Sequence, residues 1–317
     1  MTVPEPVGSR SDGRRPELRA AAAVLMVPAM QRLDVYQPLW AMELRRPDGL
    51  EWPLEKKFEM CRAAGYDGLA IDLVDTDIAA TRVMRPLYEA YRLGCIINAF
   101  PKSIEDLRPV LVAAREFDAR FVNVIGLVMP LRVEEAAPVI RAWMRMADET
   151  GVTVHFETHR NCITNDLFFT LLLMEAVPEM RLCADLSHTL IDREFRYPLS
   201  SGDQALICRI LERSDAFQGR VASREQIQVQ ITFPQHQKWF DLFLGWWKEG
   251  FRLWRARAAP DAVLNFQCEL GPPRDYAITG PDGYEMSDRW TEALVIRDRV
   301  QAIWQRLEKG AADSPPA

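Results

Sequence analysis

An apolar run that ends in ionisable side chains occupies residues 152–160, where the sequence reads VTVHFETHR. Short apolar runs begin at residues 68, 94, 121, 152 and 181, so successive starts are 26, 27, 31 and 29 residues apart. Segments with the apolar period of a helix lie between these runs. A repeat of about 30 residues is the length of one strand and one helix in a βα barrel of roughly 250 residues. The spacing therefore predicts one closed (β/α)8 TIM barrel.

Eight apolar runs in all can supply the strands of such a barrel, and five segments between them have helical period and typical helix ends. The predicted strands are Ala21–Val27, Gly68–Leu73, Gly94–Ala99, Phe121–Leu127, Val152–Thr158, Arg181–Leu186, Glu225–Ile231 and Val263–Leu270. The predicted helices are Pro53–Ala64, Ser103–Phe117, Val133–Thr150, Thr164–Ala176 and Asp203–Arg213. We expect one barrel domain over residues 20–309, between mobile tails at residues 1–19 and 310–317.

The composition excludes two classes of protein. The chain has 317 residues, with 39 Lys and Arg against 45 Asp and Glu, so its formal net charge is −6. A protein held to nucleic acid by phosphate contacts usually has a basic patch or a pI above about 9. No stretch approaches the roughly 20 apolar residues of a membrane span. The six cysteines lie far apart without a C-x-x-C pair, which is typical of reduced core thiols in a cytoplasmic protein.

Ionisable side chains stand where three of the predicted strands end. In the fifth strand His155, Glu157 and His159 share one parity, so they point to the same side. Asp185 stands at the end of the sixth strand, and Glu269 stands at the end of the eighth, just before a Gly-Pro-Pro sequence. In a parallel barrel the active groups gather at the carboxyl ends of the strands. We therefore expect these three carboxylates to meet.

Three carboxylates from three strand ends are the ligands that a divalent, oxygen-preferring cation such as Mn²⁺ or Mg²⁺ requires. For any one of them, a helix N-cap or a salt bridge would explain the residue equally well. Their coincidence favours a metal site formed by Glu157, Asp185 and Glu269. His155 lies one step deeper in its strand, and we interpret it as a hydrogen-bonded core histidine.

The predicted seventh strand adds a row of amide side chains. Gln226, Gln228 and Gln230 share one face of Glu225–Ile231, and β-branched residues share the other face, which must meet the helices. Amide oxygens bind hard cations, and Gln228 has the depth expected of a fourth metal ligand. The alternative is that these amides only hydrogen-bond across the interior of the barrel.

Aromatic residues concentrate in the segment Trp239–Trp254, which contains four tryptophans and three phenylalanines. We interpret this segment as an amphipathic helix that packs on the barrel. A partner surface or a subunit interface is the alternative, since aromatic residues are enriched in interface cores.

The order of these residues resembles a known superfamily. A strand-end Glu157, an Asp185-x-x-His188 sequence 28 residues later, a polar seventh strand and a strand-end Glu269 resemble the xylose-isomerase-like barrels of sugar isomerases and epimerases. The resemblance covers roughly residues 20–305, the extent expected of one whole barrel. It implies that Glu157, Asp185, a seventh-strand residue and Glu269 bind the metal and that His188 contacts the substrate. The sequence departs from the pattern at Gln228, where that superfamily has a histidine.

A narrower resemblance is to the α subunit of bacterial C-glycoside deglycosidases, and it rests on residues 157–159 (Glu-Thr-His) and 224–228 (Arg-Glu-Gln-Ile-Gln). It implies Mn²⁺, with Mg²⁺, Co²⁺ or Zn²⁺ as alternatives. It also implies a small, mostly β partner subunit in a hetero-oligomer, and a 3-oxo-C-glycoside substrate that is cleaved by elimination. In that reaction His159 is the base and His188 orients a hydroxyl or protonates the aglycone. Arg160 then holds a substrate oxygen or pairs with a ligand carboxylate.

Two other functions stay open from the sequence. In a metal-dependent ketose epimerase or aldose–ketose isomerase, Glu157 and Glu269 would move a proton beside the same polarised carbonyl. A non-catalytic sugar-binding or scaffold subunit would instead use the barrel to present Trp239–Trp254 to a partner. Metal content separates the scaffold from the two enzymes.

Overall fold

Eight parallel strands pair in sequence order, and the eighth also pairs with the first, so the sheet closes on itself. The computed structural model describes residues 1–2, 30–46, 48–73, 78–273 and 275–310. The strands are β1 (Arg32–Pro38), β2 (Gly68–Leu73), β3 (Gly94–Ala99), β4 (Val122–Val124), β5 (Val154–Glu157), β6 (Leu182–Ala184), β7 (Ser214–Gln218) and β8 (Val263–Gln267). The predicted (β/α)8 barrel is confirmed.

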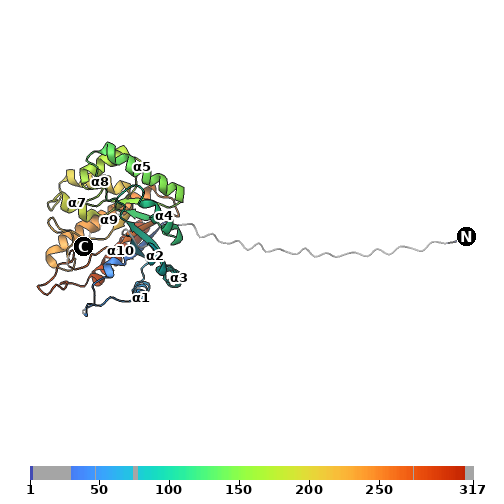
Figure 1. Ribbon diagram of the computed structural model, residues 1–317, viewed down its shortest axis with the longest axis horizontal. Helices are drawn as coiled ribbons and strands as arrows, with labels where there is room; N and C mark the ends of the chain where they lie inside the picture. The colour runs from blue at the N-terminus through green and yellow to red at the C-terminus, as the bar shows by residue number, and fades with distance from the viewer. Residues whose placement is uncertain (3–29, 47, 74–77, 274, 311–317) are drawn as a thin grey trace.

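Helices surround the closed sheet on its outer side (Figure 1). They are α1 (Leu54–Ala64), α2 (Ile78–Thr81), α3 (Arg85–Tyr91), α4 (Leu107–Glu116), α5 (Val133–Thr150), α6 (Leu167–Ala176), α7 (Leu186–Asp192), α8 (Ser201–Arg213), α9 (Gln237–Arg257) and α10 (Arg289–Glu308), with short 3-10 turns η1 (Trp40–Met42), η2 (Arg82–Met84) and η3 (Pro234–His236). In the described part of the chain, none of these helices is long and apolar enough to cross a membrane.

Six of the eight predicted strands contain an observed strand. β2 and β3 have the predicted bounds, and β4, β5, β6 and β8 lie within longer predicted runs. The helix prediction has the right bounds for α5, while α1, α4 and α6 begin later than expected and α8 begins earlier. The predicted tails, residues 1–19 and 310–317, lie outside the described residues except for residues 1–2 and 310, so the domain bounds stay a prediction.

The predicted first strand, Ala21–Val27, lies outside the described residues, and Arg32–Pro38 takes the first place in the barrel. This strand is not a continuous apolar run, because Asp34 and Gln37 interrupt it, and it was therefore not predicted. Asp34 is nevertheless buried, and it accepts a hydrogen bond of 2.9 Å from Arg32. The ion pair offsets the cost of burying the carboxylate.

The predicted seventh strand is wrong: β7 is Ser214–Gln218, and Glu225–Ile231 belongs to the connection that follows it. β7 begins directly after α8, with no Gly or Pro to mark the boundary. Gln228, Val229 and Gln230 are all buried, so the alternation of residue types in Glu225–Ile231 does not separate an inner face from an outer face. Gln228 therefore does not face the barrel interior as predicted. Its amide binds both backbone groups of Gly271, at 3.1 and 2.6 Å.

Two cores stabilise the barrel. Between the sheet and the helices lies a large apolar layer, and inside the barrel lies a smaller one. The seven aromatic rings of Trp239–Trp254 are all buried in the outer layer. The packing interpretation of that segment is thus confirmed, and the partner-surface alternative is wrong for these rings. All six cysteines are free thiols, as predicted, and all but Cys208 are buried.

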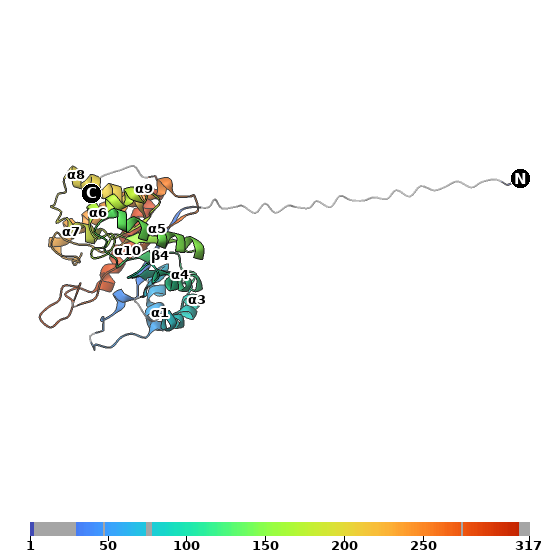
Figure 2. The ribbon, with the colours of Figure 1, turned by 45° about the horizontal axis from the view of Figure 1, so that its top comes forward.

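The connections after β1 and before α10 lie together at the carboxyl end of the strands, and Figure 2 shows both extending from the same side of the barrel. Arg289 joins them, because its guanidinium donates to the carbonyl oxygens of Ala41 at 2.9 Å and Glu43 at 2.6 Å. An ion pair of 2.5 Å between Arg45 and Asp288 adds a second link. These connections form one wall of the space above the strand ends.

Candidate active site

Three carboxylates, those of buried Glu157 and Asp185 and of half-buried Glu269, meet at the carboxyl end of the barrel. Glu157 is the last residue of β5, Asp185 directly follows β6, and Glu269 lies two residues beyond β8. One oxygen from each lies within 4.8 Å of the others. The structure thus brings together the three carboxylates that the sequence grouped, at a spacing that allows one cation to be held between them.

Asp185 has two roles, one for each carboxylate oxygen. Oδ1 caps α7, because it accepts hydrogen bonds from the backbone N–H of Ser187 at 2.9 Å and from its hydroxyl at 2.5 Å. Oδ2 faces the site, 3.4 Å from Nε2 of His188. The N-cap explanation and the site explanation of this residue are therefore compatible.

Glu157 is surrounded by amides and by like charge. Asn123 and Gln218 both donate to its Oε2, Gln218 at 3.1 Å. Burial, and after it the charges of Glu269 and Asp185, raise the pKa of Glu157 well above its usual range. The pKa of Glu269 is raised to about 7, again chiefly by burial, although Arg220 opposes the shift. The cluster therefore favours a bound proton or a further cation.

Arg220 is a site residue that was not identified from the sequence. It lies two residues beyond β7 and is 1% exposed. Its Nη2 donates to Oδ2 of Asp185 at 3.1 Å and to Oε1 of Glu269. Burial opposes its charge, but the carboxylates of Glu269 and Asp185 prevail and raise its pKa. Placing β7 at residues 214–218 would have located this arginine at a strand end.

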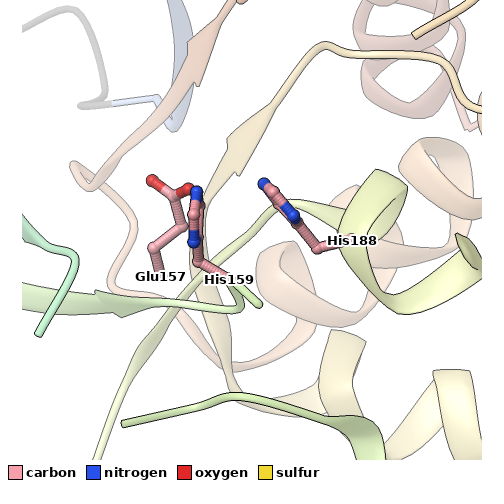
Figure 3. A group of neighbouring side chains, drawn as sticks. All are labelled: Glu157, His159 and His188. Atoms are coloured by element: carbon pink, nitrogen blue, oxygen red, sulfur yellow. The ribbon is translucent and has the colours of Figure 1, made fainter. Parts of the chain in front are cut away.

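Two histidines lie beside the carboxylates. Glu157 and His159 project to the same side of the chain around β5, and His188 points towards them from α7 (Figure 3). The ring centroids of His159 and His188 are 3.9 Å apart. His159 and His188, which the sequence analysis assigned to the same site as Glu157, therefore both lie next to the carboxylate cluster.

The hydrogen bonds of His159 fix its tautomer. Nδ1 lies 2.5 Å from the carbonyl oxygen of Arg160, which can only accept, so Nδ1 carries the hydrogen. Nε2 is then the basic nitrogen. Burial, followed by the charge of Arg220, lowers the pKa of His159 to about 4. The ring is neutral at pH 7 and can accept a proton.

His188 has the opposite tautomer. Nη1 of Arg160 lies 3.2 Å from its Nδ1, so Nδ1 accepts and Nε2 carries the hydrogen. Burial lowers the pKa of His188 well below its usual range. Within the described residues Nε2 has no hydrogen-bond partner and faces Asp185. Arg160 therefore orients both histidines, and in the described chain it contacts them rather than one of the three carboxylates.

His155 belongs to the core. It is buried with its ring centroid 4.7 Å from that of Phe121. Burial lowers its pKa to about 4. The prediction of a core position is confirmed, although Nδ1 has no hydrogen-bond partner among the described residues.

A cavity of about 210 Å³ opens beside the cluster. Carboxylates, polar groups and aromatic rings line it: Pro38, Trp40, Asp72, Asn98, Phe100, Ile125, Glu157, His159, Arg220, Glu269 and Tyr276. Drug-sized ligands usually occupy pockets of roughly 300–1,000 Å³, so this volume suits a smaller molecule. A sugar would suit this lining, because its hydroxyl groups could face the polar side chains and its C–H groups could face the aromatic rings.

Asp72 is a fourth acidic group in this cavity, and the sequence analysis passed over it inside an apolar run. It accepts a hydrogen bond of 2.8 Å from Asn98. Burial raises its pKa to about 6. Among the described residues, the lining of the cavity does not include Gln228, and Gln218 is the strand-seven amide that reaches the carboxylates.

The sequence matches no family profile and no curated protein. Solved structures do match. An L-ribulose 3-epimerase has 14% identity and a TM-score of 0.54, with 89% of this chain and 99% of that chain covered. A xylose isomerase-like TIM barrel protein from Mycobacterium smegmatis, in complex with magnesium, has 14% identity and a TM-score of 0.56, with coverage of 86% and 97%. The fold is that of a xylose-isomerase-like TIM barrel.

A further structure supports the same fold. A sugar phosphate isomerase/epimerase from Parabacteroides distasonis has 10% identity and a TM-score of 0.56, and the alignment covers 91% of this chain and 98% of that chain. Each of these alignments spans nearly the whole of the solved chain and 86–91% of this chain, so the likeness extends over the barrel.

Proposed function

We propose that this chain is a divalent-metal-dependent enzyme that moves a proton at the carbon beside a carbonyl group in a small, sugar-like substrate, as sugar epimerases and isomerases do. One observation carries the proposal: Glu157, Asp185 and Glu269 meet within 4.8 Å beside a cavity that His159 also lines. The structural neighbours that are sugar epimerases or isomerases support the substrate class.

The residues present fit a divalent cation. Carboxylate oxygens are the ligands that Mg²⁺ and Mn²⁺ prefer, and Glu157, Asp185 and Glu269 would hold the ion, with the amide of Gln218 beside them. Burial, and after it the charges of Glu269 and Asp185, raise the pKa of Glu157, and a bound cation would oppose that shift. The bound ion would act as a Lewis acid that polarises the substrate carbonyl and acidifies the neighbouring C–H group.

His159 is the group best placed to accept the proton. Its Nε2 is basic because Nδ1 donates to the carbonyl oxygen of Arg160. Its low pKa keeps the ring neutral and ready at pH 7. An epimerase or isomerase must also return a proton, and the carboxyl group of Glu269 lines the same cavity. The two groups supply the acid and the base that such a reaction needs.

A second candidate is cleavage of a 3-oxo-C-glycoside. The observation that favours it is the Glu157-Thr158-His159 sequence, which places a neutral imidazole in the cavity directly beside a carboxylate. His159 would take the C2 proton, giving an enolate at C2 and C3. The enolate would re-form the C3 carbonyl and a C1–C2 double bond as the bond from C1 to the aglycone carbon breaks. The proton taken up by His159 would pass to the departing carbon, and His188 would orient a sugar hydroxyl. Mn²⁺ and a small β subunit belong to this second proposal.

Substrate trials separate the candidates. The chelated protein is reloaded with Mn²⁺, Mg²⁺, Co²⁺ or Zn²⁺ and incubated with free ketoses and separately with a 3-oxo-C-glucoside. Conversion of a ketose to its epimer or to an aldose supports the first proposal, and release of aglycone supports the second. A protein that retains no stoichiometric metal and converts neither substrate would contradict both and favour a non-catalytic sugar-binding function.

A further inference from the structure

Arg220 already supplies one positive charge to the carboxylate cluster. Its Nη2 bridges Asp185 and Glu269, two of the three acids that would hold a divalent ion. The guanidinium carbon lies 5.1 Å from the centroid of the Tyr276 ring, which packs edge-on against Trp40. The guanidinium is thus held between the carboxylates and an aromatic wall of the cavity.

This arrangement leaves several groups without partners. Nε and Nη1 of Arg220 are buried and have no hydrogen-bond partner within the described residues. One guanidinium lies beside three clustered carboxylates and pairs with only two of them. Buried donors without acceptors cost free energy, and a buried ion pair is weak evidence of stabilisation. These features are more typical of a side chain that can move to a second conformation than of one whose contacts serve only to stabilise the fold.

We propose that Arg220 is a built-in competitor of the divalent cation, so that metal binding requires its guanidinium to leave Asp185 and Glu269. This inference rests on the proposed metal-dependent function. The released side chain stays in the cavity that it already lines, where its N–H groups can bind a substrate oxygen. Arg220 would therefore hold the acids together in the metal-free protein and contact the substrate in the loaded one.

The test is direct Mn²⁺ binding to the full chain, measured by calorimetry after chelation and without substrate. Arg220→Gln removes the competing charge and should bind Mn²⁺ about tenfold more tightly or better, since unit charges a few ångströms apart interact strongly in a buried site. Arg224→Gln is the matched control. Arg224 lies in the same connection and pairs with Glu194 at 2.7 Å near the surface, so its loss should leave Mn²⁺ affinity unchanged.

Thermal unfolding gives a second readout. In chelator, Arg220→Gln should melt below the wild type because three carboxylates lose their counter-charge, and Mn²⁺ should raise its melting temperature more than that of the wild type. If Arg220→Gln does not fold in chelator, Arg220→Lys replaces it. The compact ammonium cannot form the planar fork, so a smaller gain in Mn²⁺ affinity is expected.

The outcomes distinguish the two proposals. Equal or weaker Mn²⁺ binding by Arg220→Gln overturns the competition, while the metal-dependent function survives. Absence of Mn²⁺ binding by both the wild type and Arg220→Gln overturns the metal-dependent function and the competition together. Tighter binding by Arg220→Gln with unchanged binding by Arg224→Gln supports the competition.

Discussion

The carboxylates at the two ends of the barrel differ in how their negative charges are paired with arginines. At the amino ends of the strands two carboxylates pair with arginines: Asp34 pairs with Arg32 at 2.9 Å, and Asp215 pairs with Arg257 at 2.5 Å. At the carboxyl ends the guanidinium of Arg220 pairs with two of three clustered carboxylates, Asp185 and Glu269, and Glu157 accepts hydrogen bonds from neutral amides. Removing one partner of a balanced pair destabilises a fold, whereas an unbalanced cluster itself costs stability and is typical of a functional site. The comparison predicts opposite effects of charge removal at the two ends.

The largest effect is expected from Glu157→Gln. Neutralising this residue removes a proposed metal ligand and should lower kcat/KM by about 10²-fold or more once a substrate is known. In chelator the same change removes like-charge repulsion, so the free energy of unfolding should stay equal or rise. Steady-state kinetics and urea unfolding measure the two effects. A variant that loses stability while keeping activity would break the comparison.

His155 and His159 lie in and just after β5, and they allow a histidine of the site to be compared with a histidine of the core. His159→Ala should lower turnover by about 10²–10⁴-fold, the range for loss of a general base, and leave the Mn²⁺ content intact because the three carboxylates remain. The control, His155→Ala, removes a buried ring from the core and should lower the melting temperature while leaving kcat unchanged. Unchanged turnover in His159→Ala would remove its assignment as the base.

A moderate effect is expected at the opposite end from Asp215→Asn. The side chain is 20% exposed and pairs with Arg257 at 2.5 Å and with Arg181 at 3.7 Å. Losing the carboxylate leaves both arginines without this partner and should cost about 1–2 kcal/mol of unfolding free energy. Urea unfolding measures the cost, and kcat should not change. A large loss of kcat at full stability would show that the two ends are not functionally distinct.

The sequence predicted the parts of this molecule in which each strand is a continuous apolar run. β2 and β3 were predicted at their bounds, and the three carboxylates were located because each stands where such a run ends. β1 was missed because polar residues interrupt it, and β7 was missed because it starts without a turn signal. Because the seventh strand was predicted at the wrong residues, Gln228 was chosen as the candidate amide ligand. Gln218 and Arg220, which lie in and just after the observed β7, were not identified.

Contacts between residues far apart in the chain could not be predicted in the same way. Arg220 reaches Asp185 and Glu269 across 35 and 49 residues, and no local pattern marks it as buried. The tautomers of the two histidines depend on the carbonyl oxygen and the guanidinium of Arg160, which act only once the chain has turned after β5. Residue types at strand ends predict the chemistry of a site, whereas the partners of its charges come from the fold.

The smallest effect concerns Asp72, an acid of the carboxyl end that lies apart from the three-carboxylate cluster. Burial raises its pKa to about 6, above the value of about 4 in an unfolded chain. The folded state therefore binds this proton more tightly, so its stabilising contribution is present below pH 4 and is lost as the pH rises through about 6. Asp72→Asn removes this dependence. Urea unfolding of both proteins from pH 4 to 7 should show the wild type losing stability relative to the variant, and parallel profiles would mean that Asp72 is as well solvated as an ordinary surface acid.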